Sequence, residues 1–257
     1  EEPNAGTITV GGVEVTDPDA DINALRTRMG MVFQQFNLFG HLSVLDNCTI
    51  AQIKVLGRDR ATAEKIAREQ LAKVGLADKE NAYPSKLSGG QQQRLRYALA
   101  TMHSPELLIL DEPTAGMDVN ARRTFWERME AIAERGTTIL FATHYLEEAQ
   151  NFAQRIVLME SGSIIADGSS DEIRALTGHR HLSFLAPAPI TDLNVPVEVT
   201  EESGGYRHRI SVLEIEQVLR TLLNNYSISD LEVTKPSLDE SFTLLTEQAA
   251  ASKASDA

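Results

Sequence analysis

The chain of 257 residues has few of the features that mark secreted, disulfide-bonded or membrane-spanning proteins. Cys48 is its single cysteine, which excludes an internal disulfide and a cysteine-based zinc site and fits a reducing compartment. No run of about 18 apolar residues occurs, so the sequence predicts no membrane-spanning segment. The first residues carry neither the basic nor the apolar stretch of a secretory signal, so we expect none.

Positive charge is also scarce. Lys and Arg number 24 against 37 Asp and Glu, which gives a net charge of −13. Such a chain repels the phosphates of nucleic acids and anionic lipid head groups, so we expect no nucleic acid partner, although a local basic patch stays possible. The apolar share of 42% and charged share of 24% are those of a globular protein with a sizeable core.

Apolar segments alternate with helical patterns over the first two thirds of the chain. Residues 107–110 form an uninterrupted apolar run, as expected for a strand buried on both faces of a parallel sheet, and residues 138–143 form a second one. Residues 7–15 are typical of two short strands around Gly11-Gly12, a β-hairpin signal. Residues 44–76 have helical spacing, and so do the residues between the two apolar runs. This order predicts a doubly wound α/β fold, in which ligands bind outside the carboxyl ends of the strands.

The pattern changes at residues 177–196, where a glycine and three prolines interrupt it. Beyond them, residues 206–233 are typical of a strand, a helix and a second strand, and Ser237 to Glu240 matches a helix-opening capping box. We therefore expect a first domain at 1–178 with a helical subdomain at about 36–104. A small α+β unit at 179–248 and a flexible tail at 249–257 would follow.

Ser88-Gly89-Gly90-Gln91 is the first candidate site. The serine and glutamine suit a capping box, and the helix they open would offer free N–H groups and a positive dipole end to an anion such as phosphate. The glycines would let a ligand approach the backbone closely. An ordinary glycine-containing helix start is the alternative.

A second candidate site follows the first apolar run. Asp111 and Glu112 stand at the tip of that strand, and His144 ends the next one. An aspartate there can hold Mg²⁺, usually through water, while an adjacent glutamate can orient and deprotonate an attacking water. An acidic strand-to-loop turn is the alternative for the carboxylates alone, but three polar features at separate strand or helix ends favour a nucleotide site.

Five segments together resemble the motifs of ATP-binding cassette (ABC) ATPases, in order and spacing, over roughly residues 1–178. They are the signature motif at Leu87 to Gln91, the Walker B strand at Leu107 to Glu112, the D-loop at Ala115 to Asp118, the switch histidine at His144 and the Q-loop glutamine at Gln34. The resemblance implies a P-loop NTPase-like α/β domain that binds ATP and Mg²⁺.

The resemblance also implies a role for each residue. Asp111 would support Mg²⁺, and Gln34 would link the metal site to the helical subdomain. Glu112 would be the general base for the hydrolytic water, and His144 would contact the γ-phosphate. The remaining matches would act on ATP bound to a second, head-to-tail subunit: Ser88, Gly89, Gly90, Gln91 and Asp118.

The family further implies partners and a location. Transmembrane permease subunits would dock from the membrane, with their coupling helices received near Gln34 to Gln52. The chain would then lie at the cytoplasmic face of the cell membrane as a peripheral subunit, and ATP binding and hydrolysis would close and reopen its dimer.

One motif of the family is missing from these 257 residues: the phosphate-cradling P-loop, G-x-x-x-x-G-K-[ST]. Losing three or more charge-assisted hydrogen bonds at the phosphates costs on the order of 5 kcal/mol. We therefore expect an N-terminally shortened ABC ATPase that, by itself, binds and hydrolyses ATP weakly or not at all.

Two parts of the sequence give opposite indications of the direction of transport. Residues up to about Arg94 resemble polar amino acid importers, whereas residues from Leu95 onward resemble drug-resistance exporters of the ABC-2 type. We expect export of a drug or lipid-like substrate, because the whole C-terminal half favours it. Import of polar amino acids is the alternative, and a catalytically silent module remains open. A soluble ABC ATPase of DNA repair or translation is less favoured.

Other conspicuous residues are given structural roles. His179, His181 and His208 lack metal-ligand spacing and are interpreted as surface residues. Phe125 and Trp126 are interpreted as packing residues.

Overall fold

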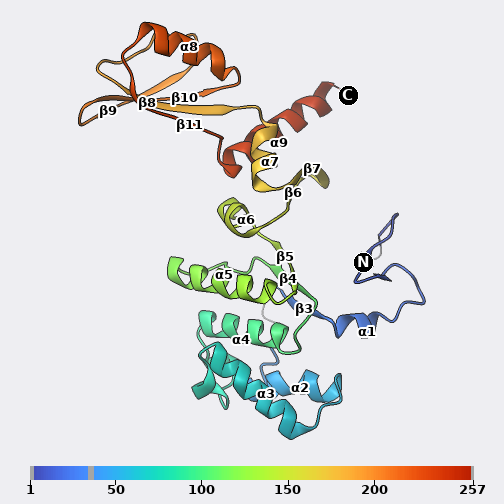
Figure 1. Ribbon diagram of the computed structural model, residues 1–257. Coiled ribbons are helices and arrows are strands. Elements are labelled where there is room, and N and C mark those ends of the chain that lie inside the picture. The colour runs from blue at the N-terminus through green and yellow to red at the C-terminus, as the bar shows by residue number, and fades with distance from the viewer. Residues whose placement is uncertain (1–2, 34–37, 256–257) are drawn as a thin grey trace. The chain divides into compact units, whose positions relative to one another are not determined.

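The computed structural model describes residues 3–33 and 38–255, with side chains up to residue 251. It divides the chain into two compact units, Glu1–His144 and Tyr145–Ala257 (Figure 1). Each unit is described by itself below. Among the described residues, no helix combines the length and the apolar character that crossing a membrane requires.

A parallel sheet forms the centre of the first unit. Its order is β3 (Met29–Val32), β4 (Leu107–Asp111) and β5 (Thr138–Ala142). A short hairpin, β1 (Thr9–Val10) with β2 (Val13–Glu14), and helix α1 (Ile22–Arg26) precede β3, as the sequence predicted for the hairpin. Parallel strands joined by helical segments are the α/β arrangement that we expected.

Burial on both faces was the wrong expectation for these strands. On β4, Leu108 and Leu110 are fully buried, whereas the alternate residues are only half-buried. On β5, Leu140 is 59% exposed. Within the described part of the chain β5 pairs with β4 alone, so it is an edge strand of this sheet, and one face of the sheet lies open.

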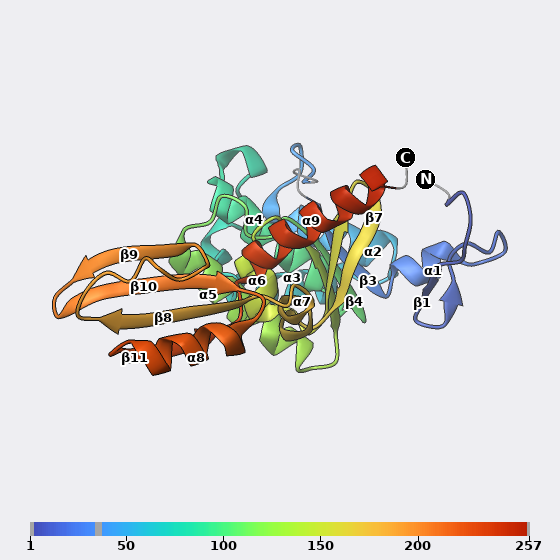
Figure 2. The ribbon, with the colours of Figure 1, turned by 90° about the horizontal axis from the view of Figure 1, so that it is seen from above.

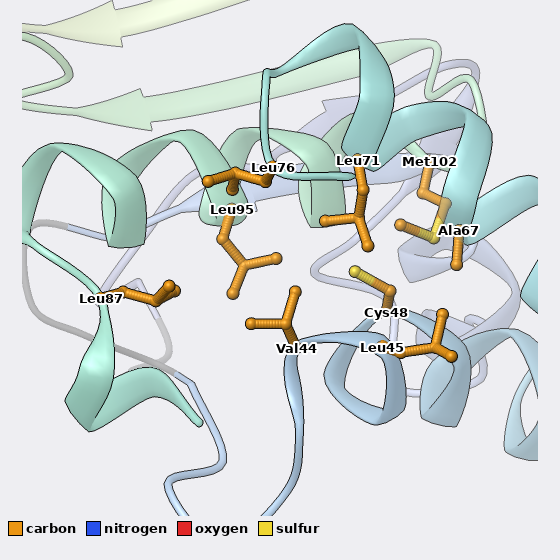
Figure 3. Close-up of a cluster of buried hydrophobic side chains, with 9 residues drawn as sticks. All are labelled: Val44, Leu45, Cys48, Ala67, Leu71, Leu76, Leu87, Leu95 and Met102. Atoms are coloured by element: carbon orange, nitrogen blue, oxygen red, sulfur yellow. The ribbon is translucent and has the colours of Figure 1, made fainter. Parts of the chain in front are cut away.

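The helical subdomain is held together by its own apolar core. It contains α2 (Val44–Lys54), α3 (Arg60–Lys73), 3₁₀ turns at Ala77–Lys79 and Pro84–Lys86, and α4 (Gly89–Thr101). Figure 3 shows its buried side chains: Val44, Leu45, Cys48, Ala67, Leu71, Leu76, Leu87, Leu95 and Met102. Burial raises the pKa of the Cys48 thiol to about 12, so the thiol stays protonated at neutral pH.

The helical pattern over residues 44–76 forms two helices rather than one. Gly57 adopts φ +64°, a left-handed conformation that ends regular helix, and Asp59 then caps α3 by accepting a hydrogen bond from the Thr62 N–H at 3.0 Å. The break lets α3 fold back onto α2. Helix α5 (Val119–Ala133) follows β4.

The second unit begins earlier than we expected, at residue 145 rather than 179. Its first part holds α6 (Leu146–Phe152), the hairpin of β6 (Ile156–Glu160) and β7 (Ser163–Gly168), and α7 (Ser170–Leu176). The last helix, α9 (Leu238–Ser255), returns to this part and lies beside β7 (Figure 2). Leu238 and Leu245 of α9 share one core with Ile156, Leu158 and Ile173. This long-range packing moves the boundary.

The start of α9 confirms the predicted capping box. The Ser237 N–H donates to the Glu240 carboxylate at 2.7 Å, and the Glu240 N–H donates to the Ser237 hydroxyl at 3.2 Å. We expected a flexible tail from residue 249, but α9 continues to Ser255. The segment is rich in alanine, the strongest helix former, which explains the continuation.

An antiparallel sheet forms the other part of the second unit. Its order is β11 (Ser229–Thr234), β8 (Arg180–Ala186), β10 (Gly205–Val212) and β9 (Val197–Glu202) (Figure 2). Helix α8 (Ile215–Asn225) packs on one face, where Leu222 meets Leu182, Phe184 and Ile210 in a common core.

His208 on β10 corrects another expectation, because it is fully buried rather than at the surface. Its ring stacks on Phe184 at a centroid distance of 4.9 Å. Nε2 accepts the Ile190 N–H at 2.9 Å, which leaves Nδ1 to donate to the Tyr206 carbonyl at 2.9 Å. Both ring nitrogens are satisfied, so His208 is a structural core residue.

Candidate functional site

The carboxyl ends of β4 and β5 bring two of the predicted catalytic residues together. The strands pair in parallel, with Asp111 opposite Ala142. Glu112 and His144 follow the ends of their respective strands at neighbouring positions. The Glu112 N–H donates to the Ala142 carbonyl at 2.9 Å, so the backbone of Glu112 is held against the end of β5.

The two side chains meet directly. His144 Nδ1 lies 2.7 Å from Glu112 Oε2, so the imidazole and the carboxylate are in direct contact. The Glu112 side chain is 18% exposed and that of His144 is 63% exposed. The pair therefore joins a shielded carboxylate, suited to act as a base, to an imidazole that remains open to a ligand.

The backbone of Glu112 is strained. Its φ is +46°, a left-handed conformation that costs a non-glycine residue about 1–2 kcal/mol. The bond to the Ala142 carbonyl and a bond from the Ala115 N–H to the Glu112 carbonyl (3.2 Å) hold this geometry. Strain that the surroundings enforce gathers at functional sites, where it aims a side chain.

Asp111 is the half-buried last residue of β4, beside Glu112. Among the described residues no group of three His, Cys, Asp or Glu side chains is placed to cage a metal. A single carboxylate nevertheless fits Mg²⁺, which keeps several waters and is held by one or two carboxylates together with substrate phosphates. The second predicted metal residue, Gln34, lies outside the described residues.

The Ser88–Gln91 turn forms the predicted capping box at the start of α4. The Ser88 hydroxyl accepts the Gln91 N–H at 3.3 Å, and the Gln91 side chain accepts the Ser88 N–H at 2.9 Å. The Gln91 amide oxygen is therefore engaged in holding the turn.

Gly89 and Gly90 are exposed, and a Cβ built on either would meet nothing within 4 Å. Neither has a positive φ. Packing within the chain therefore does not require glycine at these two positions. Glycine at these two positions would instead allow a group from outside the chain to approach the backbone closely.

Asp118 has a local structural role. Its carboxylate accepts the Ala121 N–H at 2.9 Å and caps α5. It is exposed, as is Gly116, which turns the chain just before it with φ +74°. The cap uses one oxygen, so the other can still reach a ligand.

Two contacts that the sequence did not predict tie α4 to the loop after Glu112. The Tyr97 hydroxyl donates to the Pro113 carbonyl at 2.5 Å, and the Gln93 side chain donates to the same oxygen. Both donors are buried. They connect the helix that starts at Ser88 to the residue directly after the candidate base. No sequence signal marks this link, because it joins positions 16 and 20 residues apart through a backbone carbonyl.

The comparisons with known proteins identify the family. The family model described as ABC transporter matches residues 1–115. The glutamine transport ATP-binding protein GlnQ of Escherichia coli K12 is 43% identical over 169 residues, 66% of this chain and 70% of that protein. The glutamate/aspartate import ATP-binding protein GltL of the same strain is 42% identical over 166 residues, covering 65% and 69%.

Solved structures give the same result. A dimeric ATP-binding cassette in a post-hydrolysis state, bound to ADP and Pi, has a TM-score of 0.60 at 28% identity and covers 66% of this chain and 75% of its own. An ATP-binding subunit of an ABC transporter has a TM-score of 0.61 at 26% identity, covering 69% and 72%. With relatives this similar, the chain belongs to the ATP-binding subunits of ABC transporters, the ATPases that couple ATP hydrolysis to transport.

Proposed function

We propose that this chain is the ATP-hydrolysing subunit of an importer for polar amino acids. The observation that supports hydrolysis is the Glu112–His144 pair at the ends of β4 and β5. In this proposal Glu112 accepts the proton of the attacking water, and His144 orients the carboxylate and contacts the γ-phosphate. Asp111 would hold Mg²⁺ through water, with Gln34 completing that site.

The proposed substrate class replaces our first expectation of export. The relatives similar to this chain are named for glutamine, glutamate/aspartate and arginine transport, at 38–43% identity. These names favour the alternative that the first part of the sequence suggested. Similarity over about two thirds of the chain supports import more strongly than the short C-terminal motifs support export.

The open glycines support the proposed dimer. Ser88, Gly89 and Gly90 would meet ATP bound to a head-to-tail partner, and Asp118 would reach across the same interface. Exposed glycines with free space around them suit a surface that another subunit's nucleotide approaches closely. The dimeric state of a similar cassette supports the same arrangement.

Docking of the permease is proposed for the helical subdomain. A cavity of about 210 Å³ is lined by residues of α2 and α4, among them Asn47, Ile50 and Leu99, with Phe39 at its edge. Phe39 is 51% exposed, and Asn47 holds the backbone of Phe39 through two hydrogen bonds of 2.9 and 3.0 Å. A fixed, exposed aromatic beside an apolar cavity suits a coupling helix from a membrane subunit. The chain would then act at the cytoplasmic face of the membrane.

Steady-state Mg-ATPase activity of the 257-residue chain tests the catalytic role. We expect weak turnover, because the chain contains no P-loop motif, and Glu112→Gln should lower any turnover at least 100-fold, as loss of a general base does. Glu130→Gln makes the same substitution at an exposed residue of α5 and should leave the rate unchanged. Equal rates in Glu112→Gln and the parent would contradict the role of Glu112. Absence of turnover in all three proteins would favour the silent module.

The direction of transport is tested by purifying the chain with its natural membrane partners. Recovery of a polar amino acid binding protein, with ATPase activity stimulated by that protein and its ligand, is the expected result. Stimulation by a drug or lipid-like compound, without any binding protein, would restore export.

A further inference from the structure

A large cleft of about 950 Å³ lies between α4 and α5; the Glu112–His144 pair does not line it, but Ser88, Gly90, Gln91 and Asp118 do. The two helices run side by side in the first unit (Figure 1), and their facing residues line it along most of α5. The C-terminal end of α3 contributes Lys73 and Val74, and Pro105 with Thr137 lines the cleft beside the starts of β4 and β5. The cleft is within the size range of sites that enclose a small organic molecule.

The floor of this cleft is apolar. Tyr97, Phe125 and Met129 line it and are each at least 94% buried, with the Tyr97 and Phe125 rings 4.5 Å apart. Two hydroxyls in the lining are engaged within the protein. The Tyr97 hydroxyl donates to the Pro113 carbonyl, and the Thr137 hydroxyl donates to the Pro105 carbonyl at 2.9 Å. An apolar group bound beside them would therefore not strand these two hydroxyls.

The charges that line the cleft are mostly positive, in a chain whose net charge is −13. The cations are Lys73, Arg94, Arg128 and Arg135, and the anions are Glu106 and Asp118. Glu106 is committed elsewhere, whereas Asp118 keeps one carboxylate oxygen open to a ligand. Arg28 binds the Glu106 carboxylate through two hydrogen bonds, and the Asp118 carboxylate caps α5.

Three of the cations remain available to a ligand. Arg94 donates to the Val74 carbonyl at 3.0 Å and so helps to build the wall. Lys73, Arg128 and Arg135 are exposed, and the structure assigns none of their side chains a hydrogen bond or ion pair with another described residue. This is the local basic patch that the sequence left open.

We propose that the cleft between α4 and α5 is a binding site for a free amphiphilic carboxylate. The apolar body would lie on Phe125 and Met129, and the carboxylate would be bound by Arg128 and Arg135 with Lys73 nearby. Guanidinium groups bind carboxylates through two parallel hydrogen bonds, which gives the anion its preference over a neutral or cationic analogue. The proposal does not depend on the direction of transport, and the cleft shares Ser88, Gly90 and Asp118 with the proposed ATP interface.

Trp126 supplies a reporter for this site. It is the single tryptophan of the chain, and its ring lies 5.1 Å from that of Phe125, the floor residue. Dodecanoate, kept below its micelle concentration, is titrated into the 257-residue chain while Trp126 emission is followed. Equilibrium dialysis of labelled dodecanoate gives the stoichiometry. We expect saturable binding of one molecule per chain, and at least tenfold weaker binding of dodecyltrimethylammonium.

Variants locate the bound anion. Arg128→Gln combined with Arg135→Gln should weaken dodecanoate binding at least tenfold. Arg123→Gln is the matched control, because Arg123 lies on the same helix, is exposed and does not line the cleft. Its binding should equal that of the parent. Circular dichroism checks that each variant is folded, and Lys73→Gln, on another helix, provides a second variant that should weaken binding.

Several outcomes would overturn the proposal. They are no saturable binding by dialysis, equal affinity for the cationic analogue, or equal loss of affinity in Arg123→Gln and the double variant. Co-sedimentation of the chain with phosphatidylglycerol vesicles, without binding of free dodecanoate, would assign the basic patch to a lipid surface and would overturn it as well.

Discussion

His144 and His208 stand in two regions of the protein that use the same side chain in opposite ways. His144 follows β5, is largely exposed and contacts the Glu112 carboxylate. His208 lies inside the antiparallel sheet, is fully buried and meets two backbone groups and the Phe184 ring. The first has ring surface left for a ligand, whereas the second has none.

The difference teaches how a functional residue can be distinguished from a structural one. Buried polar groups are normally satisfied by fixed partners, as His208 is. At the strand ends the opposite holds, because Glu112 keeps a left-handed backbone and its partner stays open to solvent. At this site a strained backbone occurs together with an exposed partner, whereas His208 in the core has all its polar groups satisfied.

The largest expected effect on stability is at His208. His208→Ala leaves the Ile190 N–H and the Tyr206 carbonyl without partners and removes the stack on Phe184, so we expect a loss of about 3–5 kcal/mol. Amide hydrogen exchange of β8 and β10 measures it. His144→Ala should change protection by less than about 0.5 kcal/mol, as exposed residues do. Equal effects of the two variants would remove the distinction.

A smaller effect is expected at Glu112. Glycine adopts φ +46° without the penalty that a Cβ brings, so Glu112→Gly should be about 1 kcal/mol more stable than Glu112→Ala. Both variants lose the ion pair with His144 and should be inactive, so their difference isolates the backbone strain. Urea unfolding followed by Trp126 fluorescence measures this difference. Identical midpoints would show that the backbone at this position is relaxed.

The smallest effect is expected at the amino ends of β3 and β4, opposite the end of the sheet that holds Glu112. Arg28, just before β3, binds Glu106, just before β4, and its hydrogen bonds lower the pKa of that carboxyl. A lowered pKa in the folded state adds stability that is present above the unfolded pKa of about 4.3 and is lost as the pH falls through the folded value. The urea midpoints of the parent and Arg28→Gln should therefore differ slightly at pH 7 and converge as the pH falls below the folded pKa of Glu106.

A constant difference from pH 7 to pH 3 would show that Arg28 contributes by packing and not through Glu106. The Arg28–Glu106 pair serves as a reference for the Glu112–His144 pair at the opposite ends of the strands. An exposed ion pair at the amino ends of the strands contributes little, whereas the pair at the carboxyl ends is attached to a strained backbone.

Local patterns predicted much of the fold. The hairpin of β1 and β2, the strands around Asp111 and in the C-terminal sheet, and the capping boxes at Ser88 and Ser237 all follow from signals within a few residues. The helix break at Gly57 was missed, because the apolar spacing continues on both sides of a residue whose positive φ ends the helix.

The domain boundary could not be read from the sequence. Composition changes near residue 178, but α9 packs on α6, α7 and β7 and draws residues 145–176 into the second unit. Contacts between segments more than 60 residues apart decide this, and no short pattern records them.

The sequence by itself determined the family and the chemical groups of the site. The motifs that carry them, a glycine-containing helix start and carboxylates after an apolar strand, are runs of neighbouring residues. Only the tertiary structure decided that Glu112 meets His144 at 2.7 Å, that His208 is a core residue, and that four cations line one cleft. Each of these depends on strands or helices that are distant in sequence and are brought together by register and packing.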